Sequence, residues 1–346
     1  MKATLKEIAA LLGSEPMGPD REIELLLTDS RSLTDSAKSL FFALRTETND
    51  GHRYIKELYE RGVRAFVVND IPAGPHELPD DASWIRVPDT LKALQKVGSL
   101  GKRNAASVVA ITGSRGKTTL KEWLFQILSP TLDVSRSPRS YNSQIGVPLS
   151  MWGIRSGSDV ALIEAGISRV GEMAALADCI QPDTVVVTNV GDAHAQGFSS
   201  REEKIREKAS LAAADSVRCV IYCADDLAID AEIKRQCSGK VLVGWHRKDL
   251  PSEIFGEAFG GQEVKDWEIE NAGHAMAVAR RLCRPDESVA KELKRLHRIG
   301  TRLNVSEGVN DCLVIHDSYT SDQSSLAPAL DFMKRRLAPG SKETLI

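Results

Sequence analysis

Short apolar runs alternate with amphipathic segments along most of the chain. The apolar runs that have the length of buried strands are 39–44, 65–68, 84–87, 108–112, 159–164, 184–190, 218–223 and 241–245. Segments with the features of helices lie between or beside them, at 1–13, 53–61, 89–103, 120–128, 201–214, 226–236 and 271–284. Alternation of this kind predicts an α/β fold with parallel sheets.

A glycine-rich turn joins the run 108–112 to the helix expected at 120–128. Its candidate phosphate-binding residues are Gly113, Ser114, Arg115, Gly116, Lys117, Thr118 and Thr119. Glycines let backbone N–H groups converge on an anion, the helix start adds the positive end of its dipole, and Lys117 supplies a charge. The Thr118 hydroxyl is then placed to ligate a Mg²⁺ held by the phosphates. Because Ile111 stands where the common longer pattern has glycine, an ordinary glycine turn with a solvated lysine remains the alternative.

Polar residues follow two other predicted strands and reach the same edge of the sheet, where open α/β sheets bind their ligands. Glu164 ends one run, and a carboxylate there either completes a Mg²⁺ shell or is a surface group. His194 follows the next run, although a lone histidine is usually a structural residue. Lys208, on the expected helix 201–214, reads from the residues alone as a solvated lysine. As a carbamate formed with CO₂ it would instead be an anionic oxygen ligand.

The N-terminal part carries its own polar cluster, Asp29, Ser30 and Arg31. In a turn, these hydroxyl, carboxylate and guanidinium groups can bind a nucleotide base and a diphosphate. A helix cap with a surface arginine explains the same residues, and the sequence alone favours that interpretation. Farther along, residues 140–148 read as a polar turn that a glycine and a proline hold in a fixed shape.

The pattern divides the chain into three parts. Residues 1–87 form a small N-terminal α/β domain, 88–300 a central P-loop ATPase domain with a parallel sheet, and 301–346 the start of a Rossmann-like C-terminal domain. The helix expected at 89–103 connects the first two parts. Residues 260–270 read as a loop with an edge strand.

The end of the chain continues the alternation. We expect a second helix at 286–297, a loop at 305–311, a strand at 312–316, a helix at 325–337 and the beginning of a strand at 344–346. That last strand has no further sheet to join, so the chain is expected to stop inside the third domain.

Composition narrows the possible partners. With 346 residues, 42% of them hydrophobic and 27% charged, the chain is long enough for two domains and part of a third. The net charge of −3 without basic blocks argues against nucleic acid or an anionic membrane as a partner. No apolar run approaches the roughly 20 residues that span a bilayer, and the six cysteines form no CxxC pair. We therefore expect a cytoplasmic protein with buried free thiols.

Taken together, the motifs resemble those of the Mur ligases, the ATP-dependent amide ligases of peptidoglycan precursor synthesis. The residues that carry the resemblance are the loop 112–119, Glu164 to Gly166, 188–194 with Gly197 and Phe198, Lys208, Asn271, Arg302 and 317–319. Within the family, four segments are most similar to the members that join D-alanyl-D-alanine to UDP-N-acetylmuramoyl-tripeptide: 29–31, 40–44, 50–52 and 142–148. Some of those relatives are fused ahead of an alanine racemase, and the N-terminal part is similar to theirs.

The resemblance implies roles in ATP binding. Lys117 and the loop amides would hold the β- and γ-phosphates, with Thr118 and Glu164 on one Mg²⁺. His194 and a carbamylated Lys208 would serve a second Mg²⁺. The remaining ATP contacts implied are Asn271 to adenine, Asp317 to the ribose and Arg302 to the phosphates.

The resemblance also implies how the substrates are bound. Asp29, Ser30 and Arg31 would lie near the uridine diphosphate of UDP-N-acetylmuramoyl-tripeptide, and Asn142 near its reacting end. The peptide carboxylate would attack the γ-phosphate to give an acyl phosphate, and the amine of D-alanyl-D-alanine would displace phosphate. The third residue of the tripeptide is not indicated by the sequence.

Several positions depart from the family pattern. Ser140, Ser143 and His274 stand where asparagine is common, and Thr320, Asp322 and Gln323 differ from the usual residues after Asp-Ser-Tyr. Two alternatives therefore stay open. One is another amide ligase with the same ATP domain, such as a different Mur ligase or a folylpolyglutamate or cyanophycin-type ligase. The other is a nucleotide-binding scaffold or fragment without activity of its own.

Overall fold

The computed structural model describes residues 1–70, 81–191, 197–250 and 265–282, the positions 289, 292, 293 and 295–297, and two strands at 304–307 and 313–316. The chain forms two compact units, Met1–Leu250 with Lys265–Val289, and Pro251–Val264 with Ala290–Ile346. Within the described ranges, no helix combines the length and apolar character needed to cross a membrane.

The N-terminal sheet of the first unit has the strand order β2-β7-β6-β5-β4. Its strands are β2 (Pro16–Met17), β4 (Leu25–Leu27), β5 (Ser39–Phe42), β6 (Ala65–Val68) and β7 (Ser83–Arg86). Strands β4 to β7 run parallel, and β2 pairs antiparallel with β7. A short antiparallel pair, β1 (Ala3–Thr4) with β3 (Glu22–Ile23), lies beside α1 (Leu5–Leu12).

Both faces of this sheet are buried, which explains why its strands read as continuous apolar runs. On one face Leu40 and Phe42 of β5 pack in a core with Leu5 and Ile8 of α1. On the other face Phe41 packs with residues of α2 (Ile55–Glu60). The period of two residues along a strand sends neighbouring side chains to opposite cores.

The central sheet has six parallel strands in the order β13-β12-β11-β8-β10-β9. Their bounds are β8 Ala105–Thr112, β9 Val134–Arg136, β10 Ser158–Ala165, β11 Thr184–Val187, β12 Cys219–Cys223 and β13 Val241–Trp245. In the register of the sheet, Thr112 at the end of β8 lies opposite Ala165 of β10 and Val187 of β11. Chain segments that follow these three strands therefore meet at one edge.

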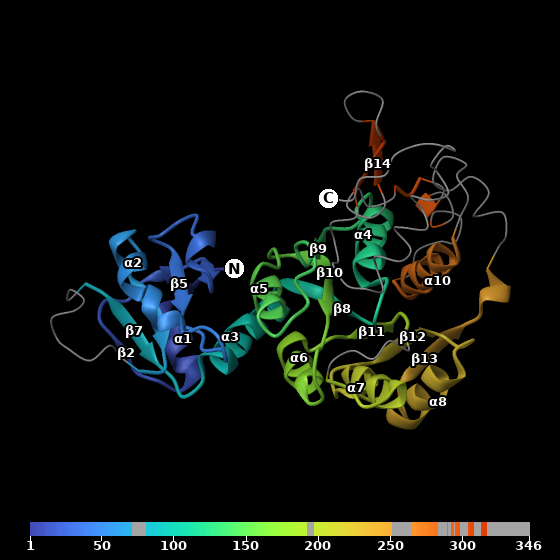
Figure 1. Cartoon of the computed structure of the whole chain (residues 1–346), viewed down its shortest axis with the longest axis horizontal. Helices are drawn as coiled ribbons and strands as arrows, with labels where there is room; N and C mark the ends of the chain where they lie inside the picture. The colour runs from blue at the N-terminus through green and yellow to red at the C-terminus, as the bar shows by residue number, and fades with distance from the viewer. Residues whose placement is uncertain are drawn as a thin grey trace. The chain divides into compact units, whose positions relative to one another are not determined.

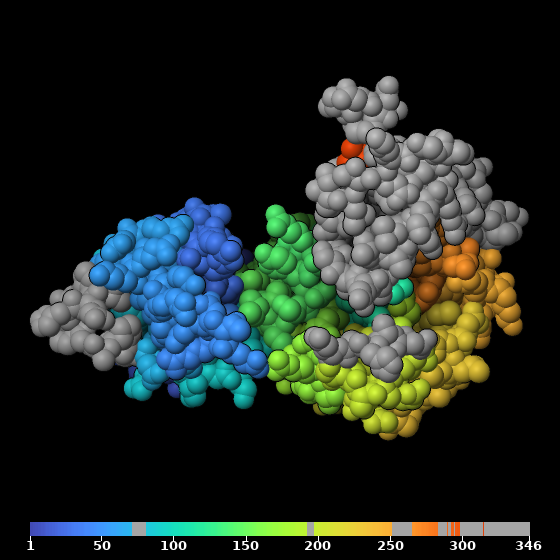
Figure 2. All heavy atoms as spheres, in the orientation of Figure 1, coloured from blue at the N-terminus to red at the C-terminus, as the bar shows by residue number. Residues whose placement is uncertain are grey.

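Helices cover both faces of the central sheet (Figure 1). One face is covered by α5 (Gly146–Trp152), α6 (Glu172–Ile180), α7 (Arg201–Ala213) and α8 (Leu227–Gln236). The other face carries α4 (Lys117–Leu128) and α10 (Asp266–Arg281), which contact each other. Helices α7 and α8 also pack side by side and form a continuous outer surface in Figure 2.

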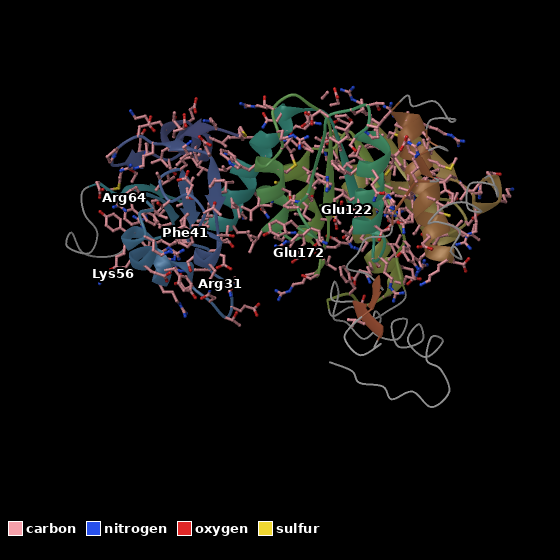
Figure 3. All side chains as sticks on the ribbon, turned by 90° about the horizontal axis from the view of Figure 1, so that it is seen from above. Arg31, Phe41, Lys56, Arg64, Glu122 and Glu172 are labelled. Atoms are coloured by element: carbon pink, nitrogen blue, oxygen red, sulfur yellow. The ribbon has the colours of Figure 1, made fainter. Side chains whose placement is uncertain are left out.

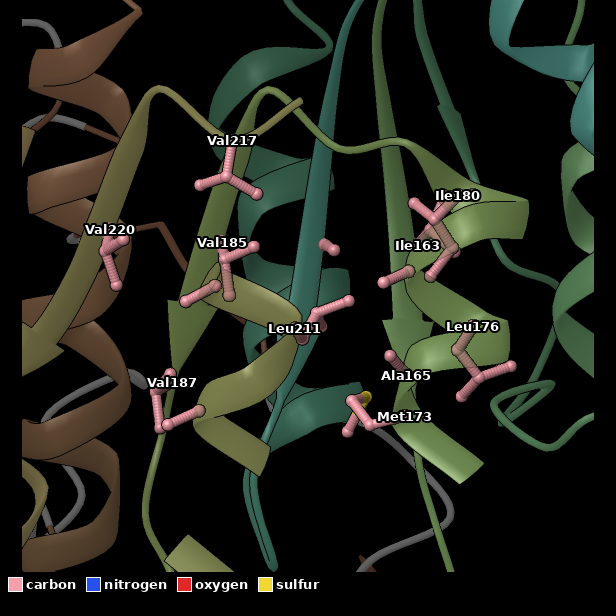
Figure 4. Packing of buried hydrophobic residues seen from close by; sticks show 14 of the residues in the cluster. Ile163, Ala165, Met173, Leu176, Ile180, Val185, Val187, Leu211, Val217 and Val220 are labelled. Atoms are coloured by element: carbon pink, nitrogen blue, oxygen red, sulfur yellow. The ribbon is translucent and has the colours of Figure 1, made fainter. Parts of the chain in front are cut away.

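The largest core of the central sheet is apolar throughout. Figure 4 shows part of it, in which residues of α6 and α7 meet those of β10, β11 and the β12 region: Ile163, Ala165, Met173, Leu176, Ile180, Val185, Val187, Leu211, Val217 and Val220. Four of the cysteines are described, at positions 179, 219, 223 and 237, and each of them is a free thiol. Burial raises the pKa of Cys179 to about 12, as expected for an inert core thiol.

The α/β class predicted from the sequence is confirmed, with local corrections. Gly146 and Pro148 belong to the first turn of α5 and not to a separate turn. Proline fits there because the N–H groups of a helix's first turn have no acceptor within the helix. The expected loop at 260–270 is wrong over its last five residues, because α10 begins at Asp266. The expected loop at 305–311 contains part of β14 (Asn304–Glu307), which pairs antiparallel with β15 (Leu313–His316) in the second unit.

Three expectations about the end of the chain remain open. The helix expected at 325–337 and the strand expected at 344–346 lie outside the described residues, as does half of the helix expected at 286–297. The division of the chain at residues 87 and 300 stays a prediction.

Candidate active site

The glycine-rich turn after β8 has the conformation that only glycine adopts easily. Gly113 has φ +147° and Gly116 has φ +84°. A Cβ on Gly113 would lie 1.9 Å from the Thr188 hydroxyl oxygen, and one on Gly116 would lie 2.7 Å from Oδ1 of Asn271. The two positions are therefore closed to larger residues. The turn leads into the N-terminus of α4, and the positive end of a helix dipole favours a bound anion.

Residues after β11 hold this turn in place. The backbone N–H of Ser114 donates to the Asn189 carbonyl at 2.7 Å, and that of Arg115 donates to the Asn189 side chain at 3.2 Å. The Thr188 hydroxyl donates to the Arg115 carbonyl at 2.7 Å. Sequence analysis gave these two residues no separate role, although a polar pair that ends a wholly apolar run was the available signal.

Lys117 folds back over the turn that precedes it. Its ammonium donates to the carbonyl oxygen of Gly113 at 2.7 Å and to that of Ser114 at 3.4 Å. The side chain is half-buried. A phosphate bound by the turn would therefore lie within reach of this charge, as the sequence predicts.

Thr118 and Glu164 are brought together at the meeting point of β8 and β10. The Thr118 hydroxyl donates to Oε2 of Glu164 at 2.9 Å, and both residues are buried. A hydroxyl and a carboxylate oxygen are ligands that Mg²⁺ accepts, and they lie beside the proposed phosphate site. The arrangement fits a Mg²⁺ bound between nucleotide and protein. The alternative that Glu164 is a surface group is excluded by its complete burial.

A buried lysine that the sequence analysis missed completes this cluster. Lys121 of α4 is fully buried, and its Nζ lies 3.0 Å from Oε1 of Glu164. Lys121 follows Thr118 by three residues, so helical geometry places both on the face toward β10. That spacing was the signal available in the sequence.

Lys208 lies under the phosphate-binding turn and is not the solvated lysine that the residues alone suggested. Its side chain is nearly fully buried, and its Nζ donates to the Gly113 carbonyl at 3.2 Å. Burial holds the pKa of the amine well below its usual value, and the charges of Lys117 and Lys204 act in the same direction. The lowered pKa makes the neutral amine, which is the form that reacts with CO₂, more accessible than in an exposed lysine.

Asn271 and His274 lie on successive turns of α10. Asn271 is buried, its side chain donates to the Trp267 carbonyl at 2.8 Å, and its Oδ1 borders Gly116 as described above. His274 is fully buried and accepts a hydrogen bond at 3.1 Å from the indole N–H of Trp245. Burial lowers the pKa of His274 to about 3, and a contact with the backbone of Thr188 acts in the opposite direction. We infer a neutral, structural histidine beside the nucleotide site.

The polar residues before α5 reach the same site. The backbone N–H of Gly166 donates to the Asn142 carbonyl at 2.7 Å, and a Cβ on Gly166 would lie 2.9 Å from Oδ1 of Asn142. Gly166 follows Glu164 by two residues, so Asn142 lies next to the predicted cation ligands. That Asn142 lies near a reacting group stays a prediction.

Asp29, Ser30 and Arg31 lie in the N-terminal sheet, after β4. The Asp29 carboxylate caps the short 3₁₀ helix η1 (Ser30–Ser32), accepting from the Arg31 backbone N–H at 3.0 Å and from its guanidinium at 2.7 Å. These hydrogen bonds hold the pKa of Asp29 below its usual value. The Arg31 side chain is 88% exposed, and Figure 3 labels it on the outside of the N-terminal region. The cap geometry is therefore present, with a guanidinium that remains accessible to a ligand.

Two cavities with mixed polar and apolar linings lie at the carboxyl ends of parallel strands. One of about 790 Å³, in the N-terminal sheet, is lined by Arg45, Asn69, Asp70, Arg86 and residues 87–91. A second of about 610 Å³, beyond the phosphate turn, includes Asn189, Arg201, Asp226, Arg247 and Glu270. Neither was predicted, because each is formed by loops that are distant in the sequence. Three further predicted residues, His194, Arg302 and Asp317, lie outside the described residues.

Comparison with known protein families gives two matches that follow each other along the chain. Residues 22–100 match the pattern described as the Mur ligase family catalytic domain, and residues 111–276 match the Mur ligase middle domain. They include the predicted residues of the phosphate turn, Glu164, Lys208 and Asn271.

Curated relatives and solved structures agree with these matches. The UDP-N-acetylmuramoyl-tripeptide–D-alanyl-D-alanine ligase of Bacillus subtilis is 28% identical over 99% of this chain and 78% of its own length. The ligase of the same name from Treponema pallidum is 30% identical over 87% of this chain and 69% of its own length.

The fold of the chain is that of solved MurF structures. The crystal structure of MurF from Acinetobacter baumannii matches 97% of this chain and 77% of its own, with a TM-score of 0.82 and 23% identity. MurF from Thermotoga maritima in complex with ADP matches 90% of this chain and 75% of its own, with a TM-score of 0.71 and 22% identity. The chain therefore belongs to the Mur ligase family.

Proposed function

We propose that this protein is an ATP-dependent ligase that joins D-alanyl-D-alanine to UDP-N-acetylmuramoyl-tripeptide in peptidoglycan precursor synthesis. The observation that carries the ATP chemistry is the contact of the Thr118 hydroxyl with the Glu164 carboxylate directly beside the phosphate turn. The substrates follow from the relatives of that name, which align with nearly the whole chain. Because the reaction consumes ATP, we also propose a cytoplasmic location.

The reaction begins with two anions. The tripeptide carboxylate attacks the γ-phosphorus of ATP, the bond to ADP breaks, and an acyl phosphate forms. The amine of D-alanyl-D-alanine then attacks the acyl carbon, loses a proton and expels phosphate. Since like charges must approach each other, Mg²⁺ supplies charge neutralisation when bound, and Lys117 with the loop N–H groups adds to it. Interactions of this kind contribute on the order of several kcal/mol each.

The described residues take the following roles in this proposal. The turn 113–116, Lys117 and Thr119 bind the phosphates, and Thr118 with Glu164 ligates one Mg²⁺. Asn271 contacts adenine from α10. Support comes from its place against Gly116, which puts its amide beside the phosphate turn.

A second Mg²⁺ site would be formed by His194 and by Lys208 as a carbamate. The position of Lys208 supports the second assignment, because its buried amine lies against the phosphate turn. A carbamate there would place anionic oxygens where a free ammonium would repel a cation. Arg302 and Asp317 keep their proposed contacts to the phosphates and the ribose.

The nucleotide-linked substrate would be bound by the N-terminal sheet. We assign its uridine diphosphate part to Asp29, Ser30 and Arg31, which lie at the carboxyl edge of parallel strands. Asn142 lies near the reacting carboxyl group. Its contact with Gly166, next to Glu164, supports this assignment.

The proposal is tested by calorimetric titration of the chain with UDP-N-acetylmuramoyl-tripeptide, with UDP-N-acetylglucosamine as the control. Binding of the tripeptide nucleotide at least 100-fold tighter than the control is expected. No difference between the two ligands, in a folded protein that binds Mg·ADP, would favour another amide ligase of the same family. A second readout is phosphate release from ATP, which we expect only when both peptide substrates are present. Release without them would indicate a nucleotide switch.

A further inference from the structure

Lys121 is a charged residue on the buried face of α4. Its side chain is fully buried, as are those of Leu120, Trp123 and Leu124. Taking an ammonium out of water costs several kcal/mol unless it is paired and hydrogen-bonded. Replacing such a buried pair by apolar residues is often neutral or stabilising, so stability alone gives no reason for a lysine here.

The ammonium of Lys121 joins groups from two sides of the site. On one side it lies 3.0 Å from Oε1 of Glu164, whose other oxygen accepts from Thr118. On the other side it donates to the carbonyl of Ser137 at 2.8 Å and to the carbonyl of Arg139. These two carbonyls open the segment that leads to Asn142.

That segment needs to be held in place. Arg139 has φ +47°, a left-handed conformation that is uncommon for residues with a side chain. The segment is tied back to the sheet beyond it, where the Gly166 N–H donates to the Asn142 carbonyl. The ammonium of Lys121 thus lies between the predicted cation ligands, Thr118 and Glu164, and the segment that leads to Asn142.

Glu122, the next residue on α4, contributes to this junction from the surface. Its carboxylate lies 3.2 Å from Nζ of Lys121 and 3.0 Å from Nε of Arg136. Figure 3 labels Glu122 on α4. A partly exposed carboxylate therefore balances the charge of Lys121, which leaves Glu164 free to act toward a cation.

We propose that Lys121 is a positioning residue that fixes Glu164 toward Thr118 and fixes the Asn142 segment at the same time. The ion pair with Oε1 opposes rotation of the carboxylate. Oε2 therefore stays beside the Thr118 hydroxyl, at the predicted Mg²⁺ position. Binding the two carbonyls keeps Asn142 next to Glu164. The identity of the substrate near Asn142 rests on the proposed function. The inference about Glu164 rests on geometry alone.

Two substitutions separate these actions. Lys121→Met keeps the length of the side chain and removes all donors, whereas Lys121→Gln keeps N–H donors for the carbonyls and removes the charge. Lys102→Met is the matched control, because Lys102 pairs with Asp183, which also accepts from the backbone N–H of Val108 near the start of β8. Melting curves of all variants establish that each is folded.

The effect of Lys121 on Glu164 is measured without turnover, as the affinity of the protein–ADP complex for Mn²⁺ determined by electron paramagnetic resonance. We expect half-saturation at a Mn²⁺ concentration at least tenfold higher in both Lys121 variants, and within twofold of wild type in Lys102→Met. The effect of Lys121 on the Asn142 segment is measured as the KM for UDP-N-acetylmuramoyl-tripeptide. It should rise at least tenfold in Lys121→Met and return to within threefold of wild type in Lys121→Gln.

A wild-type value for Mn²⁺ binding in a folded Lys121→Met or Lys121→Gln protein would overturn the proposal. If Lys121→Met does not fold, Lys121→Gln decides the Glu164 side by itself. An equal KM in both folded Lys121 variants would refute the Asn142 side. Failure of the proposed function would appear differently, as absence of substrate-dependent phosphate release in the wild type, and the Mn²⁺ measurement would still test Lys121.

Discussion

At the scale of single residues, Lys208 shows how burial changes what a side chain can do. Its amine is enclosed under the phosphate turn, where its protonated form is disfavoured by burial and by neighbouring lysines. If the proposed carbamate forms there, the function of this residue is carried by two anionic oxygens rather than by a positive charge.

The first prediction concerns this residue. Lys208→Ala should reduce ligase activity at least 100-fold, because one anionic ligand is lost beside the nucleotide phosphates. Added formate or acetate should restore part of the activity by supplying a carboxylate in the vacated space. Activity is measured as phosphate release at several carboxylate concentrations. The control is Lys234→Ala, which replaces an exposed lysine of α8. Its activity should equal that of the wild type with and without added carboxylate. Full activity of Lys208→Ala without added carboxylate would remove Lys208 from the site.

His274 gives a prediction about pH. Its pKa is lowered from 6.5 to about 3 by burial, so the folded protein leaves it neutral where the unfolded chain takes up a proton. The unfolded state then binds more protons between pH 6.5 and 3, and stability must fall as the pH is lowered through this range. From pH 7 to pH 5 the loss from this residue is about 2 kcal/mol.

The measurement is urea unfolding of the wild type and of His274→Asn at pH 7 and pH 5. The variant should lose about 2 kcal/mol less than the wild type between the two pH values, whatever its absolute stability. Parallel pH dependences for wild type and His274→Asn would mean that His274 is protonated in the folded state.

At the scale of elements, the phosphate turn depends on its contact with the end of β11. Gly113 leaves just enough room for the Thr188 hydroxyl, which donates to the Arg115 carbonyl and lies 3.2 Å from the Thr112 carbonyl. Gly113→Ala should therefore displace the turn and weaken ADP binding at least tenfold, as measured by calorimetry. Gly157→Ala is a matched control, because Gly157 also has a positive φ, +83°, and has open space around its Cβ position. Equal ADP affinity in Gly113→Ala and wild type would show that the turn tolerates the methyl group.

The elements that the sequence predicted correctly have strong local patterns. The runs at 65–68 and 241–245 match β6 and β13, and the helix expected at 226–236 differs from α8 by one residue. Long-range pairing is what the sequence could not show. β14 overlaps an expected loop, because the strand pairs with β15 and its own short sequence carries no strand pattern. The start of α10 was assigned to a loop because Asp266 and Glu268 make its first turn polar.

The same division holds for the candidate site. Thr118 and Glu164 could be expected to meet, because each lies at the carboxyl end of a neighbouring parallel strand or just beyond it. The burial of Lys121 could not be expected from composition, since lysine is usually exposed and its partners come from two other parts of the chain. At Lys121, tertiary contacts therefore override the usual preference of lysine for the surface.

At the scale of the whole molecule, one short helix connects the N-terminal and central cores within the first unit. Val147 and Met151 of α5 pack in the central core, whereas Trp152 packs in the N-terminal core with residues of α1, β5 and α3 (Thr90–Gly98). The indole N–H of Trp152 donates to the Glu24 carbonyl at 2.7 Å. The two sheets are therefore joined by buried apolar contacts, and we expect them to unfold together.

The last prediction tests this coupling. In the wild type, calorimetry should show one transition for the first unit, and Mg·ADP at 100 times its Kd should stabilise that whole unit by about 2.7 kcal/mol. Trp152→Ala removes a side chain whose loss typically costs about 3–5 kcal/mol. It also removes a buried contact between α5 and the N-terminal core. The unit should then unfold in two steps. Mg·ADP should raise the transition temperature of the central sheet and leave that of the N-terminal sheet unchanged.

Hydrogen exchange assigns the steps, since backbone amides of β5 should lose the protection that Mg·ADP gives them in the wild type while those of β8 keep it. Trp84→Ala serves as the control, because Trp84 stacks on Phe66 inside the N-terminal sheet at a ring distance of 4.9 Å. That substitution should destabilise the unit and leave a single transition. If Trp152→Ala still unfolds in one step that Mg·ADP shifts as a whole, the coupling must run through contacts other than Trp152, such as those of α3 with α5.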